Sequence, residues 1–246
     1  MKSDTEYTLS EKLSRITEQE VGGELQKGCQ GLDADKIPAL TQYVQLLMGW
    51  NEKLNLIGTR DWKKAIRTLI LDSLHLAVFL DELPLPPDPF CLDIGAGAGL
   101  PGIPLRIVWP KGEYILVEPN QKRATFLTYS LGLLRLERTA IRSVKVNELP
   151  GVVPEADLAL SRAFRPWREF LDCSSSLLSR QGLALVFSNR AWSDPDTPPP
   201  GWYFLRQKEY PVQGRGPRYF WVFQKVTRQN QGVRDSQGSD SRAVSS

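Results

Sequence analysis

Residues 89–105 read PFCLDIGAGAGLPGIPL, and this stretch decides the fold. A short apolar run ends at Asp93 and is followed by Gly95, Gly97 and Gly99. Because glycine has no side chain, the backbone can turn tightly here and a ligand can lie against it. The apolar residues that follow predict a helix, so the stretch forms a strand–loop–helix unit. Such units build open α/β sheets, in which ligands bind beyond the carboxyl ends of the strands.

Downstream of this unit, apolar runs of strand length alternate with helical patterns. This alternation predicts βαβ units and a mostly parallel, doubly wound sheet. Two aromatic segments at the end, joined by a Gly/Pro-rich turn, predict an antiparallel hairpin that closes the edge of the sheet. The expected strands are 89–95, 112–119, 139–146, 156–163, 182–189, 201–210 and 218–226, and the expected helices are 100–110, 120–134 and 166–179.

Upstream, the pattern is helical instead. Apolar residues at helical spacing predict helices over 36–54 and 61–81, and a weaker one over 9–26 that Gly22-Gly23 interrupts. The proline-rich segment PLPPDP then marks a boundary. We therefore predict an N-terminal helical extension over 1–85 and a Rossmann-like sheet domain over 86–226. A polar tail over 227–246 is predicted to be disordered, because it contains too few apolar residues to form a core.

Composition narrows the class of protein. The formal net charge of +3 permits a nucleic-acid partner without requiring one. Three widely spaced cysteines predict neither a disulfide framework nor a metal site, which fits a reducing cytosol. The N-terminus carries no secretory signal, and no apolar run is long enough to span a membrane. We expect a soluble, cytoplasmic, monomeric protein that binds no metal.

The acids around the glycine loop indicate which ligand it binds. A dinucleotide loop reads G-x-G-x-x-G and carries a pyrophosphate, whereas this loop reads G-x-G-x-G after Asp93. A carboxylate there repels phosphate but attracts the ammonium of a methionine moiety. Glu118 ends the next strand, about 20 residues on, where an acid accepts hydrogen bonds from a ribose diol. This set favours S-adenosylmethionine over NAD; the alternative is a tight strand–helix turn with surface acids.

The same residues resemble a known family. DIGAGAGLPGIPL is similar to the signature of the bacterial 16S rRNA guanine-N7 methyltransferases, also named glucose-inhibited division protein B. The resemblance runs from about Ile37 to Lys225 and includes the segments WNEKLNLIGTRD, LILDSL, LVEPNQKRATFL and LSRAF. It implies an S-adenosylmethionine-dependent methyltransferase that modifies N7 of a guanine in small-subunit ribosomal RNA, on the free RNA or in the small ribosomal subunit.

The resemblance also implies site residues. Gly95 and Leu100 are expected to line the cofactor, and Val146 and Asn147 to border its adenine. Glu118 takes the ribose-binding position, and Arg162 matches an arginine between cofactor and substrate that we assign a catalytic role.

The chain departs from the family pattern at a few positions. Leu69 stands where the family usually has histidine, Asn147 where it has glutamate, and Ser188-Asn189 where it commonly has lysine-glycine. The cofactor loop is intact, and the changes at Leu69 and Ser188-Asn189 bear on the substrate side. They keep open a catalytically weak RNA-binding or assembly factor, and a methyltransferase with a non-RNA substrate.

Basic and aromatic residues beside the expected site are candidates for RNA contact. Arginines can hold phosphates while an aromatic ring stacks on an extruded base. The alternative is a solvated helix start with core aromatics. The residues assigned to RNA are Phe164, Arg165, Lys122, Arg123 and Arg218.

Overall fold

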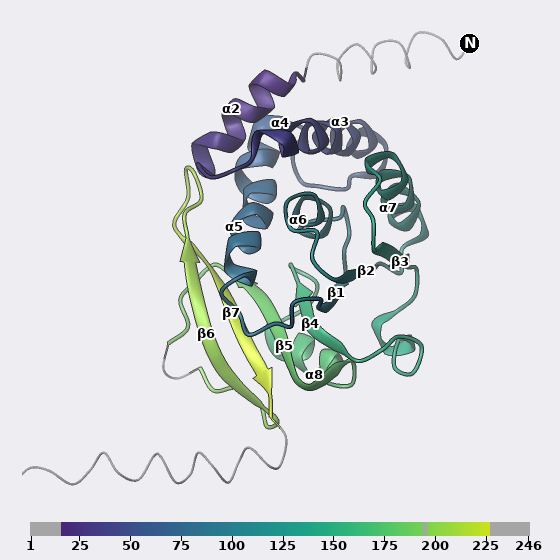
Figure 1. The fold of residues 1–246 in the computed structure, drawn as a ribbon, viewed down its shortest axis with the longest axis vertical. Coiled ribbons are helices and arrows are strands. Elements are labelled where there is room, and N and C mark those ends of the chain that lie inside the picture. The colour runs from purple at the N-terminus through teal and green to yellow at the C-terminus, as the bar shows by residue number, and fades with distance from the viewer. Residues whose placement is uncertain (1–15, 194–195, 227–246) are drawn as a thin grey trace, which may run out of the picture.

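The computed structural model describes residues 16–193 and 196–226 (Figure 1). The tail predicted over 227–246 lies outside the described residues, as does the start of the helix expected over 9–26. None of the described helices is long and apolar enough to cross a membrane.

A single twisted sheet forms the centre of the described chain, with strand order β3-β2-β1-β4-β5-β7-β6. Strands β1 to β5 run parallel, and β7 pairs antiparallel with both β5 and β6. The predicted doubly wound sheet with a C-terminal antiparallel hairpin is therefore confirmed. The strands are β1 Phe90–Ile94, β2 Glu113–Val117, β3 Thr139–Arg142, β4 Ala156–Ser161, β5 Leu178–Ser188, β6 Trp202–Tyr210 and β7 Arg218–Lys225.

Helices cover both faces of this sheet. Successive residues of a strand point to opposite faces, so alternate residues of β1, β2, β4 and β5 enter two separate cores. The larger core lies under α2 Glu18–Gly28, α3 Ile37–Leu54, α5 Leu71–Leu80, α6 Gly102–Val108 and α7 Gln121–Leu134. The smaller core lies under α8 Trp167–Ser175 and the short 3-10 helix η3 Val146–Glu148. A further 3-10 turn, η1 Ala34–Lys36, precedes α3.

Local sequence signals explain where several helices begin. The Asn120 side chain accepts hydrogen bonds from the first-turn amides of α7 and so caps this helix. One expectation was wrong: Gly22-Gly23 does not interrupt α2, which runs through both glycines behind a capping box formed by Thr17 and Glu20. A Cβ on Gly22 would lie 3.1 Å from Ile37, so glycine here allows α2 to pack closely on α3.

The helical region expected over 61–81 contains an irregular segment. It comprises α4 Trp62–Ala65, a π-helical segment η2 Ile66–Ile70, and α5. A π segment has i→i+5 hydrogen bonds, and such segments are frequent at functional sites. The backbone carbonyl of Thr68, in this segment, accepts hydrogen bonds at the site described below.

Aromatic side chains cover the sheet where β5 connects to β6. Residues 189–193 and 196–201 contain no helix. Instead, the Trp192 ring stacks on Phe204 at 4.4 Å, and Trp167 stacks on Phe223 at 5.4 Å. Trp221 meets both tryptophans edge to face. This aromatic cluster fixes the hairpin against α8.

Candidate active site

The glycine loop after β1 adopts a conformation that few other residues tolerate. Gly95, Gly97 and Gly99 have φ angles of +78°, +59° and +76°. A Cβ on Gly95 would lie 2.5 Å from the Phe164 ring, and one on Gly99 would lie 2.5 Å from Ile103. A Cβ on Gly97 would meet only the Gly95 carbonyl oxygen, at 3.7 Å. The loop is thus closed on two sides and open above Gly97.

Glu118, directly after β2, supports the loop from beneath. Its carboxylate is buried and accepts hydrogen bonds from the Gly97 amide at 2.9 Å and the Asn120 amide at 2.8 Å. Each carboxylate oxygen can accept a second bond. Glu118 therefore joins the ends of β1 and β2 and still offers acceptor capacity to a ligand.

Asp93 lies at the end of β1 and is only 1% exposed. Its Oδ2 accepts a hydrogen bond from the Tyr114 hydroxyl at 3.4 Å, while its Oδ1 has no partner among the described residues. Burial raises the pKa of Asp93 to about 7. A buried carboxylate oxygen without a partner is costly unless a ligand supplies a donor.

The helical extension contacts the loop directly. The hydroxyl of Tyr43, in α3, donates to the Ala98 carbonyl at 2.8 Å, and both groups are buried. The extension therefore helps to set the loop conformation.

Arg162, just beyond β4, is held in a buried charge cluster. Its guanidinium lies 3.0 Å from Asp72 Oδ2 and donates to the Thr68 carbonyl at 3.2 Å. Arg218, at the start of β7, donates to the same two acceptors at 2.6 Å and 3.1 Å. Asp72 is 1% exposed, and the arginine side chains are 15% and 14% exposed. Burial raises the pKa of Asp72, and the two guanidiniums oppose that rise.

The remaining predicted cofactor residues lie around the loop or on neighbouring segments. Leu100 is buried at the end of the loop. Val146 and Asn147 lie in η3, which follows β3, the neighbour of β2; Val146 is buried and Asn147 is exposed.

The residues assigned to RNA fall into different environments. Phe164 is half-buried against Gly95, so it borders the loop itself. Arg165 is exposed and pairs with Glu169 at 3.0 Å, while Lys122 and Arg123 are exposed at the start of α7. Arg218 is mostly buried rather than exposed, because its guanidinium pairs with Asp72 in the charge cluster.

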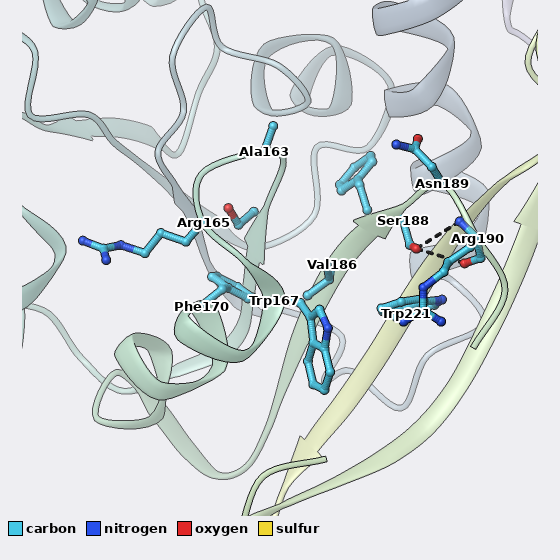
Figure 2. Close-up of a pocket in the computed structure, with 11 residues that line it drawn as sticks. Ala163, Arg165, Trp167, Phe170, Val186, Ser188, Asn189, Arg190 and Trp221 are labelled. Carbon is cyan, nitrogen blue, oxygen red and sulfur yellow. Dashed lines mark hydrogen bonds between the residues drawn. The ribbon is translucent and has the colours of Figure 1, made fainter. Parts of the chain in front are cut away.

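A cavity of about 360 Å³ opens between the ends of β4 and β5. Figure 2 shows the turn that carries Ala163 and Arg165 opposite the end of β5, where Ser188 is the last strand residue and Asn189 follows it. Its inner wall is formed by Trp167, Phe170, Val186 and Trp221. Because Phe164 lies against Gly95 while Ala163 and Arg165 line the cavity, the turn after β4 borders both the glycine loop and this cavity.

Sequence reasoning assigned no role to Tyr43, Thr68 or Asp72. The available signal for Asp72 was a lone acid within the apolar run LILDSL. Nothing in the sequence indicated that Asp72 meets two arginines from β4 and β7. Within residues 16–193 and 196–226, no group of three or more His, Cys, Asp or Glu could hold a metal ion.

Comparison with known proteins identifies the family. The family model described as rRNA small subunit methyltransferase G matches residues 36–193. Ribosomal RNA small subunit methyltransferase G of Nitratidesulfovibrio vulgaris (strain DP4) is 42% identical over 207 residues, 82% of this chain and 94% of that protein. The protein of the same name from Lawsonia intracellularis is 40% identical over 193 residues, 78% of this chain and 87% of its own.

Solved structures are less similar to this chain. The crystal structure of TrmN from Thermus thermophilus is 18% identical with a TM-score of 0.47, covering 63% of this chain and 48% of that one, and we draw no conclusion from it. The family match and the two relatives are sufficient: this chain belongs to the rRNA small subunit methyltransferase G family.

Proposed function

We propose that this protein transfers a methyl group from S-adenosylmethionine to N7 of a guanine in small-subunit ribosomal RNA. The observation that carries the proposal is the open glycine loop between two buried carboxylates, in a chain of this family. The target is 16S ribosomal RNA, free or within the small ribosomal subunit.

The residues at the loop fit this cofactor. The partnerless Asp93 Oδ1 would accept the ammonium of its methionine part, and Glu118 would accept the ribose hydroxyls. The open space above Gly97 lets a ligand lie against the backbone, with Gly95, Gly99 and Leu100 closing the loop around it. Val146 and Asn147 would border the adenine. When bound, the cofactor supplies an electrophilic methyl group on a positively charged sulfur.

Methyl transfer to guanine N7 requires little proton transfer by the protein. Guanine N7 carries a free lone pair in the neutral base, so no general base is required. The contribution of the chain is to hold the two reacting groups in line and to exclude water. Arg162, fixed by Asp72 and the Thr68 carbonyl, would hold the turn after β4 in place beside the cofactor and the base.

Exposed cations would hold the RNA backbone. Lys122 and Arg123 project from the start of α7 beside Glu118, and Arg165 projects from the turn after β4. Phosphate contacts of this kind position RNA without reading its sequence.

The test is methyl transfer mapped on RNA. Purified protein and radiolabelled S-adenosylmethionine are incubated with naked 16S RNA, with small ribosomal subunits and with total protein, and the modified base is identified. Label on N7 of one guanine in the RNA supports the proposal. Cofactor binding without transfer would instead indicate an assembly factor, and label on protein a different substrate class.

A further inference from the structure

We infer that the cavity between β4 and β5 receives an extruded purine base and that Asn189 binds the edge of that base. This inference rests on the proposed function, since it names the place where the target nucleotide would enter. The cavity lies beyond the carboxyl ends of two parallel strands, where ligands of open α/β sheets bind.

The size and walls of the cavity suit one planar ring. Its volume of about 360 Å³ falls in the range of ~300–1,000 Å³ typical of small-ligand pockets. Trp167, Phe170 and Trp221 provide aromatic surface on its inner wall, and Trp221 is 2% exposed. The aromatic cluster holds these rings in fixed positions, so the wall is formed before any ligand arrives.

The charges at the cavity are already neutralised. Arg165 pairs with Glu169, and Arg190 pairs with Asp196 while lying over the Trp221 ring at 4.9 Å. In Figure 2 the Arg165 side chain extends away from β5. Because both lining arginines are already paired, an uncharged ring can enter the cavity without burying an unpaired charge.

Among the described lining residues, the polar groups that make no hydrogen bond include a carboxamide and a buried indole N–H. The exposed Asn189 side chain makes no hydrogen bond or ion pair with any described residue. The indole N–H of Trp221 is buried and also lacks a partner within the described ranges. A carboxamide offers one donor and one acceptor side by side, which matches the O6 and N1–H of guanine. Asn189 is therefore the group that would bind the Watson–Crick edge.

This arrangement is also compatible with the chemistry. Binding through O6 and N1–H leaves N7 without a protein partner, so its lone pair stays available to react.

The test compares Asn189→Ala, directly after β5, with a matched amide within that strand. Gln181 lies near the opposite end of β5, is exposed, and its side chain is unbonded within the described residues, so Gln181→Ala serves as control. Binding of guanosine 5′-monophosphate is titrated with saturating S-adenosylhomocysteine, which occupies the cofactor site. Single-turnover methyl transfer to small ribosomal subunits is measured in parallel.

We expect Asn189→Ala to lower nucleotide affinity and transfer rate at least tenfold, with S-adenosylmethionine affinity unchanged and Gln181→Ala equal to wild type. Equal values for both variants would overturn the inference, even where wild-type transfer upholds the proposed function. If wild type binds the nucleotide through Asn189 but modifies no RNA, the base site stands and the proposed function fails. If wild type neither binds the nucleotide nor transfers methyl, both fail.

Discussion

Affinity for S-adenosylmethionine should rise with pH through the ionisation of Asp93. In the free protein burial raises the pKa of this carboxyl to about 7, so about half of it is protonated at neutral pH. An ammonium at the partnerless Oδ1 would favour the carboxylate and return its pKa toward the ordinary value of 3.8. Binding then releases a proton, and the apparent affinity falls as the pH drops below 7.

The size of this effect follows from the pKa of the free protein. The fraction of Asp93 that is ionised limits binding, so the apparent Kd should be about eightfold higher at pH 6 than at pH 7.5. Above that range the α-amino group of the ligand itself loses its proton, at pH ~8. Tyr114, Arg162, Tyr43 and Glu118 also face this carboxyl; burial keeps both tyrosine pKa values well above their ordinary range, so neither tyrosine titrates here.

Isothermal titration calorimetry provides the assay. Titrations at pH 6, 7 and 7.5 in buffers of different ionisation enthalpy give both the Kd and the protons released. Asp93→Asn should bind more weakly at pH 7.5 and lose the pH dependence, and its thermal melt shows whether it is folded. A wild-type Kd that is constant from pH 6 to 7.5, or an Asn variant with the same slope, would refute the role of Asp93.

Three further predictions concern other parts of the site. Asp72→Asn should lower the free energy of unfolding by about 3 kcal/mol in urea titrations, since two buried guanidiniums lose their anion, whereas Asp88→Asn, at an exposed pair, should change little. Gly97→Asp should abolish cofactor binding in calorimetry by filling the open loop, whereas Gly214→Asp, also at positive φ but in the hairpin turn, should bind normally. Arg165→Ala should reduce the slope of log affinity for RNA against log salt by about 0.7–0.9, and an unchanged slope would remove Arg165 from the RNA contact.

The sheet could be predicted because its signals are local. Each strand of the parallel part is a short apolar run, and each following helix has its own periodicity or cap, as at Asn120. The glycine loop could also be predicted, because its G-x-G-x-G spacing indicates directly which residues take positive φ. The prediction that Gly22-Gly23 interrupts the helix was wrong for the opposite reason. Gly22 packs closely against Ile37 of a neighbouring helix, and local sequence does not reveal this contact.

The candidate site was only partly visible in the sequence because it depends on long-range contacts. Arg218 reads as a basic residue in a predicted hairpin, yet its guanidinium pairs with Asp72 in α5. The cavity between β4 and β5 requires Trp221 from the hairpin and Asn189, which follows β5, to lie together. Such meetings follow from strand order rather than from residue spacing.

The charge cluster makes the helical extension and the sheet depend on one another. Asp72 sits in α5, while both of its arginines belong to the sheet, and the Thr68 carbonyl that they share belongs to the π segment. A fragment limited to the sheet domain would leave the guanidiniums of Arg162 and Arg218 without their anion, Asp72. A minimal catalytic fragment of this enzyme must therefore retain the helix that carries Asp72, and loosening of that helix should silence methyl transfer before the sheet itself melts.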